Sequence, residues 1–94
     1  MAIIDKVKLA LRISHTALDS DILDTIQTAR LELIRAGVLE EKANSDDELI
    51  NMAIKTYCLS AYCNDKKMAE RYDESFKYQL DNLRKSSGYM KEVV

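Results

Sequence analysis

The single histidine, His15, is the side chain best suited to acid–base chemistry near neutral pH. It lies between Ser14 and Thr16 in a polar stretch of the chain. A catalytic His15 would need an orienting carboxylate and a nucleophile that the fold brings within hydrogen-bonding reach. A lone histidine in a connecting segment is usually solvated, so the sequence favours an exposed His15 over a general base.

The two cysteines, Cys58 and Cys63, are the candidates for nucleophilic or redox chemistry. They are five residues apart within a helical pattern, which places them about 140° apart around a helix axis. That geometry does not suit a disulfide, and the spacing matches no zinc motif. We expect two partly buried free thiols in a reducing cytosol.

Two acidic clusters, residues 19–21 and 46–48, resemble pieces of a cation site. Both lack the remaining oxygen ligands at the spacing of a calcium loop, and both are better explained as helix caps. The chain has only two glycines, Gly37 and Gly88, so it has no glycine-rich phosphate loop. The sequence therefore predicts no catalytic residue, no metal ligand and no cofactor.

Four helices are expected to position these residues. The chain has no proline, and 32% of its residues are charged, which is typical of a mainly helical protein. The apolar periodicity predicts helices over residues 2–12, 20–36, 46–63 and 66–85. Their expected N-terminal caps are Asp19 or Ser20 for the second helix, Ser45 in a capping box with Glu48 for the third, and Asp65 for the fourth.

The segments between the predicted helices contain residues typical of turns and loops. Gly37 follows the last turn of the second helix and is expected to adopt a left-handed conformation there. Residues 40–45 are expected to form a polar, acidic loop. No linker or internal repeat divides the chain, so the sequence predicts a single domain over residues 1–94 with a short apolar tail at 86–94.

The apolar faces of the helices predict the fold class. The second helix carries one central stripe, and so does the fourth, which is the longest element. The third helix is apolar nearly all round, because Lys55 is its only charge between Leu49 and Cys63. Such a helix must be central in the bundle, or else be covered on one side by a neighbouring subunit. We therefore expect an all-α protein, a small bundle of four main helices with the third buried centrally.

Charge and hydropathy exclude several classes of protein. The 94-residue chain has 14 basic and 16 acidic residues, a formal net charge of −2, so it offers no basic patch for neutralising phosphates. No apolar run approaches the roughly 20 residues that cross a bilayer, and the N-terminal segment does not read as a signal peptide. The sequence predicts a protein that does not bind membranes and is made in the cytoplasm.

More apolar residues are present than one small bundle can bury. Two interpretations stay open. In the first, some of these residues pack inside the monomer and the rest are scattered over its surface. In the second, they form contacts with other proteins. The residues expected to contact neighbouring subunits or a partner protein are Leu31, Tyr78, Tyr89, Met90, Val93 and Val94.

The order of elements resembles a known family. A short first helix contains KVKLALRIS, and the second is the capped segment DSDILDTIQTARLELIRAGV. The apolar third helix, DELINMAIKTYCLSAYCND, is followed by the closing segment YDESFKYQLDNLRKSSGY. Over roughly residues 3 to 89 this sequence resembles the head–tail connector family, also called head completion or DNA-packaging connector proteins, of tailed double-stranded DNA bacteriophages and prophages.

The resemblance implies a structural role in virion assembly. Such proteins form an oligomeric ring, generally of about twelve subunits, that docks beneath the portal protein. The ring extends the DNA channel, helps to retain packaged DNA and receives a tail-completion protein. DNA then passes without specific binding, and no enzymatic activity or cofactor is implied. The protein would be assembled in the bacterial host cytoplasm and would reside at the head–tail junction of the virion, and it could be monomeric in isolation.

Two other classes compete with this interpretation. One is a small helical DNA-associated regulator that uses the helix at 66–85, or a protein–protein adaptor. The other is an enzyme subunit in which His15 or the thiols are functional.

Overall fold

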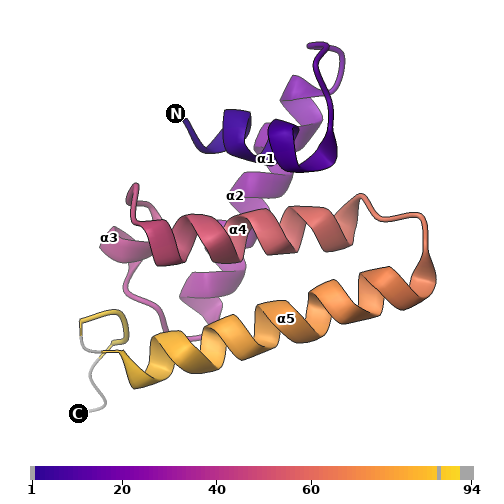
Figure 1. Ribbon diagram of the computed structural model, residues 1–94. Helices are drawn as coiled ribbons and strands as arrows, with labels where there is room; N and C mark the ends of the chain where they lie inside the picture. The colour runs from indigo at the N-terminus through magenta and orange to yellow at the C-terminus, as the bar shows by residue number, and fades with distance from the viewer. Residues whose placement is uncertain (1, 87, 92–94) are drawn as a thin grey trace.

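The chain forms a small all-α domain, as predicted (Figure 1). A computed structural model describes residues 2–86 and 88–91, which contain no strand. The helices within these ranges are α1 (Ile3–Leu11), α2 (Asp19–Arg35), α3 (Glu40–Ala43), α4 (Glu48–Ala61) and α5 (Lys66–Lys85). The predicted helices at 2–12, 20–36, 46–63 and 66–85 thus correspond to α1, α2, α4 and α5, whereas α3 was not anticipated.

Helix α4 lies at the centre of the domain, as its apolar composition predicted. It packs against α1, α2 and α5, and in Figure 1 α2 passes behind it while α5 runs alongside. Ile50, Ala53, Ile54 and Cys58 of α4 are completely buried. Burying an isoleucine side chain contributes roughly 1.5–3 kcal/mol, so α4 supplies a large part of the core.

The neighbouring helices present single apolar stripes to α4. On α2 the stripe is Ile22, Ile26, Ala29 and Leu33, which are all buried. On α5, Phe76 meets Tyr57 of α4 edge to face, with ring centroids 5.4 Å apart and the ring planes at 65°. Helical periodicity alone predicts these stripes, because every third or fourth residue returns to the same face.

The predicted capping box at Ser45 is wrong, and Asp47 caps α4 instead. The Asp47 carboxylate accepts hydrogen bonds from the backbone amides of Leu49, at 2.9 Å, and Ile50, at 3.3 Å. The Ser45 hydroxyl donates to the carbonyl of Lys42 at 2.6 Å. The physical reason is α3: residues 40–43 form a helical turn rather than the expected loop, and Ser45 satisfies a carbonyl at its end.

The predicted cap of α2 is also wrong, because the helix begins at Asp19 without a side-chain cap. The Asp19 carboxylate forms an ion pair with Lys8 of α1, with 2.7 Å between Oδ1 and Nζ. The Asp19 carboxylate therefore links α1 to α2 instead of capping the N-terminus of α2. At α5 the expected cap is confirmed: the Asp65 carboxylate accepts from the amides of Lys67 and Met68.

The turn after α2 holds the C-terminal segment, residues 88–91, against the domain. Gly37 has a φ of +106°, the positive value that its position predicted. The amide of Leu39 donates to the carbonyl of Tyr89, and the amide of Lys91 donates to the carbonyl of Gly37, both at 2.8 Å. Residues 37–39 and 89–91 thus run antiparallel for a short stretch, with Val38 and Met90 as the bridged pair.

Substitution of Gly37 by alanine is expected to lower the free energy of unfolding by about 1–2 kcal/mol. Alanine would have to adopt the same positive φ, and its Cβ would lie 3.2 Å from Cε of Met90. Urea unfolding followed by circular dichroism measures the loss. Gly88→Ala is the matched control, since Gly88 also has a positive φ but no atom within 4 Å of the added Cβ. An equal or larger loss for Gly88→Ala would contradict the role given to the Gly37–Met90 contact.

Candidate interaction surfaces

The residues best suited to chemistry do not come together in the fold. His15 is exposed in the connection between α1 and α2. Burial raises the pKa of the Cys58 thiol to about 11, so this side chain stays protonated and unreactive at neutral pH. Cys63 is half-buried and donates to the carbonyl of Asp65. Both cysteines are free thiols.

Neither a metal site nor a membrane span is found in the part of the chain that the structure describes. There, no three or more histidine, cysteine or acidic side chains converge where they could hold an ion. The described helices also include none that combines the length and the apolar character needed to cross a bilayer. Four of the acidic residues at 19–21 and 46–48 instead make structural contacts, namely Asp19, Asp21, Asp46 and Asp47.

Asp47 is the centre of a polar cluster that joins α4 to the C-terminal segment. Besides capping α4, its carboxylate accepts a hydrogen bond of 2.8 Å from the Tyr89 hydroxyl. The ammonium group of Lys42 lies 5.4 Å from the centroid of the Tyr89 ring. Partial burial alone would raise the pKa of Asp47, but the hydrogen bonds from Tyr89 and the two α4 amides, with Lys42 nearby, bring this pKa below its usual value.

Part of the predicted C-terminal contact surface makes contacts within its own subunit. Tyr89 and Met90 are half-buried and pack against the core of their own subunit. Val93 and Val94 lie outside the described residues. The participation of these four residues in contacts with other proteins stays a prediction.

Leu31 and Tyr78, the other two residues predicted to contact partners, are exposed on different helices. Leu31 of α2 is 55% exposed and Tyr78 of α5 is 67% exposed. Leu31 lies about 180° around α2 from the buried Ile22, as expected at 100° per residue. Their exposure agrees with the sequence pattern, and the structure leaves both side chains available to a partner.

A further apolar surface lies on α4, on the side that α1, α2 and α5 leave uncovered. Leu49 is 45% exposed and Met52 is 49% exposed. We call Glu48, Leu49, Met52 and Lys55 the α4 surface. The signal in the sequence was the nearly uniform apolar character of this helix, which exceeds what its three neighbours can cover.

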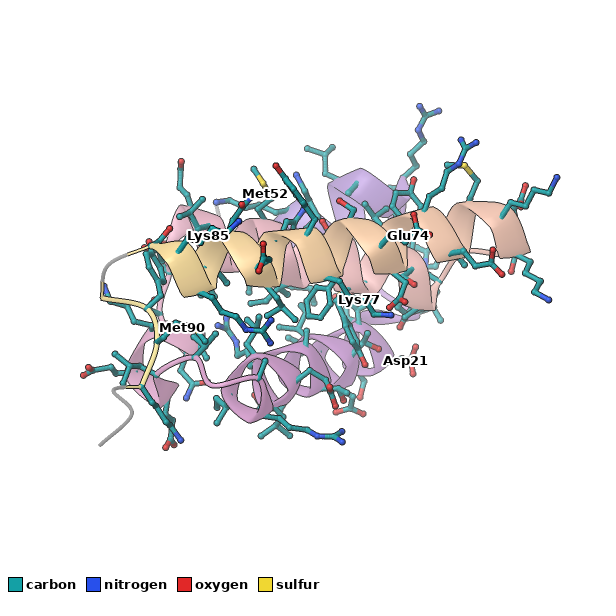
Figure 2. All side chains as sticks on the ribbon, turned by 90° about the horizontal axis from the view of Figure 1, so that it is seen from below. Asp21, Met52, Glu74, Lys77, Lys85 and Met90 are labelled. Atoms are coloured by element: carbon teal, nitrogen blue, oxygen red, sulfur yellow. The ribbon has the colours of Figure 1, made fainter. Side chains whose placement is uncertain are left out.

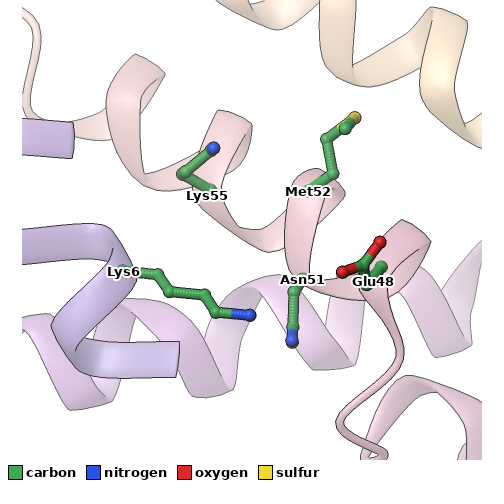
Figure 3. A pocket seen from close by; sticks show the side chains of 5 residues that line it. All are labelled: Lys6, Glu48, Asn51, Met52 and Lys55. Atoms are coloured by element: carbon green, nitrogen blue, oxygen red, sulfur yellow. The ribbon is translucent and has the colours of Figure 1, made fainter. Parts of the chain in front are cut away.

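Hollows flank Met52 on both sides. One, of about 290 Å³, lies between α1 and α4 and is lined by Lys6, Glu48, Asn51, Met52 and Lys55 (Figure 3). The other, of about 70 Å³, is mostly apolar and lies between α4 and α5, where Leu83 forms part of its wall. The buried amide oxygen of Asn51 receives no hydrogen bond from any described residue. Met52 lines both hollows and therefore lies between them.

Polar side chains that are buried or partly buried fix the helices that frame these surfaces, and sequence reasoning missed them. The Gln79 amide of α5 donates to the Thr56 hydroxyl of α4 at 3.0 Å. Arg30 of α2 donates to the carbonyl of Ala43 at 2.6 Å, which fastens α3 to α2. Burial lowers the pKa of Arg30, and the charge of Asp46 opposes that effect.

Fold and surface together define a class: a small helical interaction module with apolar side chains exposed on several of its helices. The family model described as phage connector protein matches residues 3–89. The chain therefore belongs to the phage connector protein family, and its general role is that of a phage head–tail connector. Neither the curated proteins nor the solved structures gave a significant match.

The Asp47 cluster predicts a pH-dependent contribution to stability. Asp47→Asn retains a good N-cap but removes the charge that Tyr89 and Lys42 favour. At pH 7 the variant should be less stable than the wild type by up to about 1 kcal/mol, since the site is partly open to solvent. Because the folded pKa is depressed, the wild-type advantage is complete above the unfolded value of about 3.9 and disappears as the pH falls through the folded value.

Urea unfolding of both proteins between pH 7 and pH 2.5 measures this difference. Tyr89→Phe is the companion variant, because it removes one of the hydrogen bonds that lower the pKa of Asp47. In this variant the free energy of unfolding should change less with pH than in the wild type. A stability difference that stays constant across the pH range would contradict the assignment.

Proposed function

We propose that this protein assembles into a ring beneath the portal protein, where it extends the DNA channel, helps to retain packaged DNA and provides the docking site for a tail-completion protein. The role is structural rather than enzymatic, and the location is the head–tail junction of the virion. Family membership supports the connector role. The ring and its contacts are supported by the distribution of exposed apolar residues.

The observation that carries the ring is the presence of different apolar patches on different helices of one small subunit. A closed ring is built from head-to-tail contacts, in which two unlike patches meet at every interface. Met52 on α4 and Leu31 on α2 are apolar side chains on separate helices, and both are about half-exposed. Such residues contribute to stability once a neighbouring subunit removes them from water.

The charge of the protein suits passage of DNA rather than its capture. With 14 basic and 16 acidic residues, the chain has no net positive charge with which to hold phosphates. A ring of such subunits would line a passage along which DNA slides with little retention. The ring would then help to retain packaged DNA by providing the docking site for the tail-completion protein rather than by binding phosphates.

Native mass spectrometry of the purified protein over a range of concentrations tests the ring. A closed oligomer near twelve copies is the expected result, with no shift of duplex DNA in a gel at low salt. A stable dimer that shifts DNA would contradict the proposal and indicate a regulator.

Tyr78 is proposed as a contact with the portal protein or with a neighbouring subunit. Tyr78→Asp should leave the free energy of unfolding within about 0.5 kcal/mol of the wild type, because the side chain is exposed. The same variant should lose co-assembly with the purified portal protein of the same phage or the formation of the ring itself. Unfolding of the variant would place Tyr78 in the core and contradict this assignment. His15→Ala, a substitution at another exposed position, is the control and should leave assembly intact.

A further inference from the structure

The α4 surface has a definite order of side chains along the helix. Glu48 is near its N-terminal end, Met52 follows one turn later, and Lys55 comes three residues after that. At 100° per residue these three lie within about 60° of arc, on the side of α4 that faces away from α2. None of the ion pairs among the described residues involves Glu48 or Lys55. This surface is therefore negative at one end, apolar in the middle and positive at the other.

The outer side of α2 carries the same kinds of side chain. We call Asp24, Gln27, Leu31 and Arg35 the α2 surface. Asp24, Leu31 and Arg35 lie within about 40° of arc, opposite the buried stripe of the helix. Arg35 forms only a surface pair with Glu32, at 3.5 Å, so it remains available to another carboxylate. The order from N- to C-terminus is again negative, apolar and positive.

The α2 and α4 surfaces lie on opposite sides of the subunit. In Figure 1, α2 passes behind α4, so the outer side of α2 points away from the viewer. Figure 2, turned by 90°, shows Met52 on one side of α5, and α2 with its Asp21 on the other. Two unlike patches on opposite sides of one molecule are what a head-to-tail assembly requires.

We propose that the α2 surface of one copy of this chain packs antiparallel on the α4 surface of the next copy. The two surfaces are complementary only in this direction, because an antiparallel arrangement brings the positive end of each against the negative end of the other. With Leu31 seated beside Met52, the hollows on either side of Met52 receive the neighbouring residues of α2.

The spacing of the charges fits this packing. Arg35 comes four positions after Leu31, and Glu48 comes four positions before Met52, so each pair spans about 6 Å along its helix. Arg35 of one copy then faces Glu48 of the next. At the other end, Asp24 is seven residues from Leu31, and the long side chain of Lys55 makes up the difference in rise. Each contact thus contains two ion pairs around an apolar centre.

This inference rests on the proposed ring, and a covalent cross-linking experiment separates the two. In a Cys63→Ser background, a chain with both Leu31→Cys and Met52→Cys should form a ladder of covalent oligomers under mild oxidation. A ladder forms because each chain then has two unlike ends that meet, with Cα atoms within roughly 7 Å. Chains with either cysteine alone should give little cross-linked product, and Cys58 is buried and remains in all variants.

The outcomes separate a failure of the proposed contact between the α2 and α4 surfaces from a failure of the proposed ring. If native mass spectrometry shows a ring but the doubly substituted chain gives no ladder, the ring uses other faces and this inference is wrong. Dimers formed efficiently by Met52→Cys alone would show α4 packing on α4, which also overturns it. Absence of both ladder and ring would count against the inference and against the proposed ring together.

Charge reversal provides an independent readout. Arg35→Glu and Glu48→Arg should each weaken association by about tenfold, since each turns an attractive pair into a repulsive one. Combining both reversals in one chain should restore assembly, because the pair is then reconstituted with opposite polarity. Lys77→Glu is the matched control: it disrupts a comparable surface pair, Lys77 with Asp73 at 3.0 Å, and should leave assembly unchanged. Failure of the combined variant to recover while all variants remain folded would overturn the pairing.

Discussion

The packing of α4 against α1, α2 and α5 is the constraint on which the rest of the structure depends. A 94-residue chain has room for one small core, and here that core is organised around a single helix. The apolar stripes of α1, α2 and α5 have no comparable alternative surface to cover them. Three neighbours still leave one side of α4 open, so a helix rich enough in apolar residues to hold the domain together also exposes Leu49 and Met52.

Polar side chains determine how the helices are set around this core. Thr56 and Asn51 are buried on α4 itself, where Thr56 accepts from Gln79 and Asn51 donates to Asp46 at 2.8 Å. A buried polar group without its partner costs free energy, so each of these contacts favours one arrangement of the helices over a slipped one. The Tyr62 hydroxyl adds a further tie, since it donates to the Asp21 carboxylate on α2. The open side of α4 is therefore held in a defined shape.

Local patterns in the sequence were sufficient for the four main helices and the family, but not for contacts between distant residues. Periodicity placed α5 at its observed bounds, and Asp65 capped it as expected, because both signals lie within one helix. Ser45 was misassigned because two adjacent helices compete for the same polar residues, and only the fold shows that α3 uses it. The exposure of Leu49 and the contact between Asp47 and Tyr89, 42 residues apart, depend on how whole helices are placed. No local spacing encodes such contacts.

The bond between Tyr89 and Asp47 also has a consequence for synthesis on the ribosome. Helices α1 and α2 emerge before α4, so their apolar stripes must wait for the central helix before they can be covered. Asp47 in turn receives the Tyr89 hydroxyl only after a further 42 residues have been made. Before α4 is made, the buried stripe of α2 lacks the helix that covers it in the folded domain. Completion of this fold therefore depends on contacts of high sequence separation, which form slowly compared with local helices.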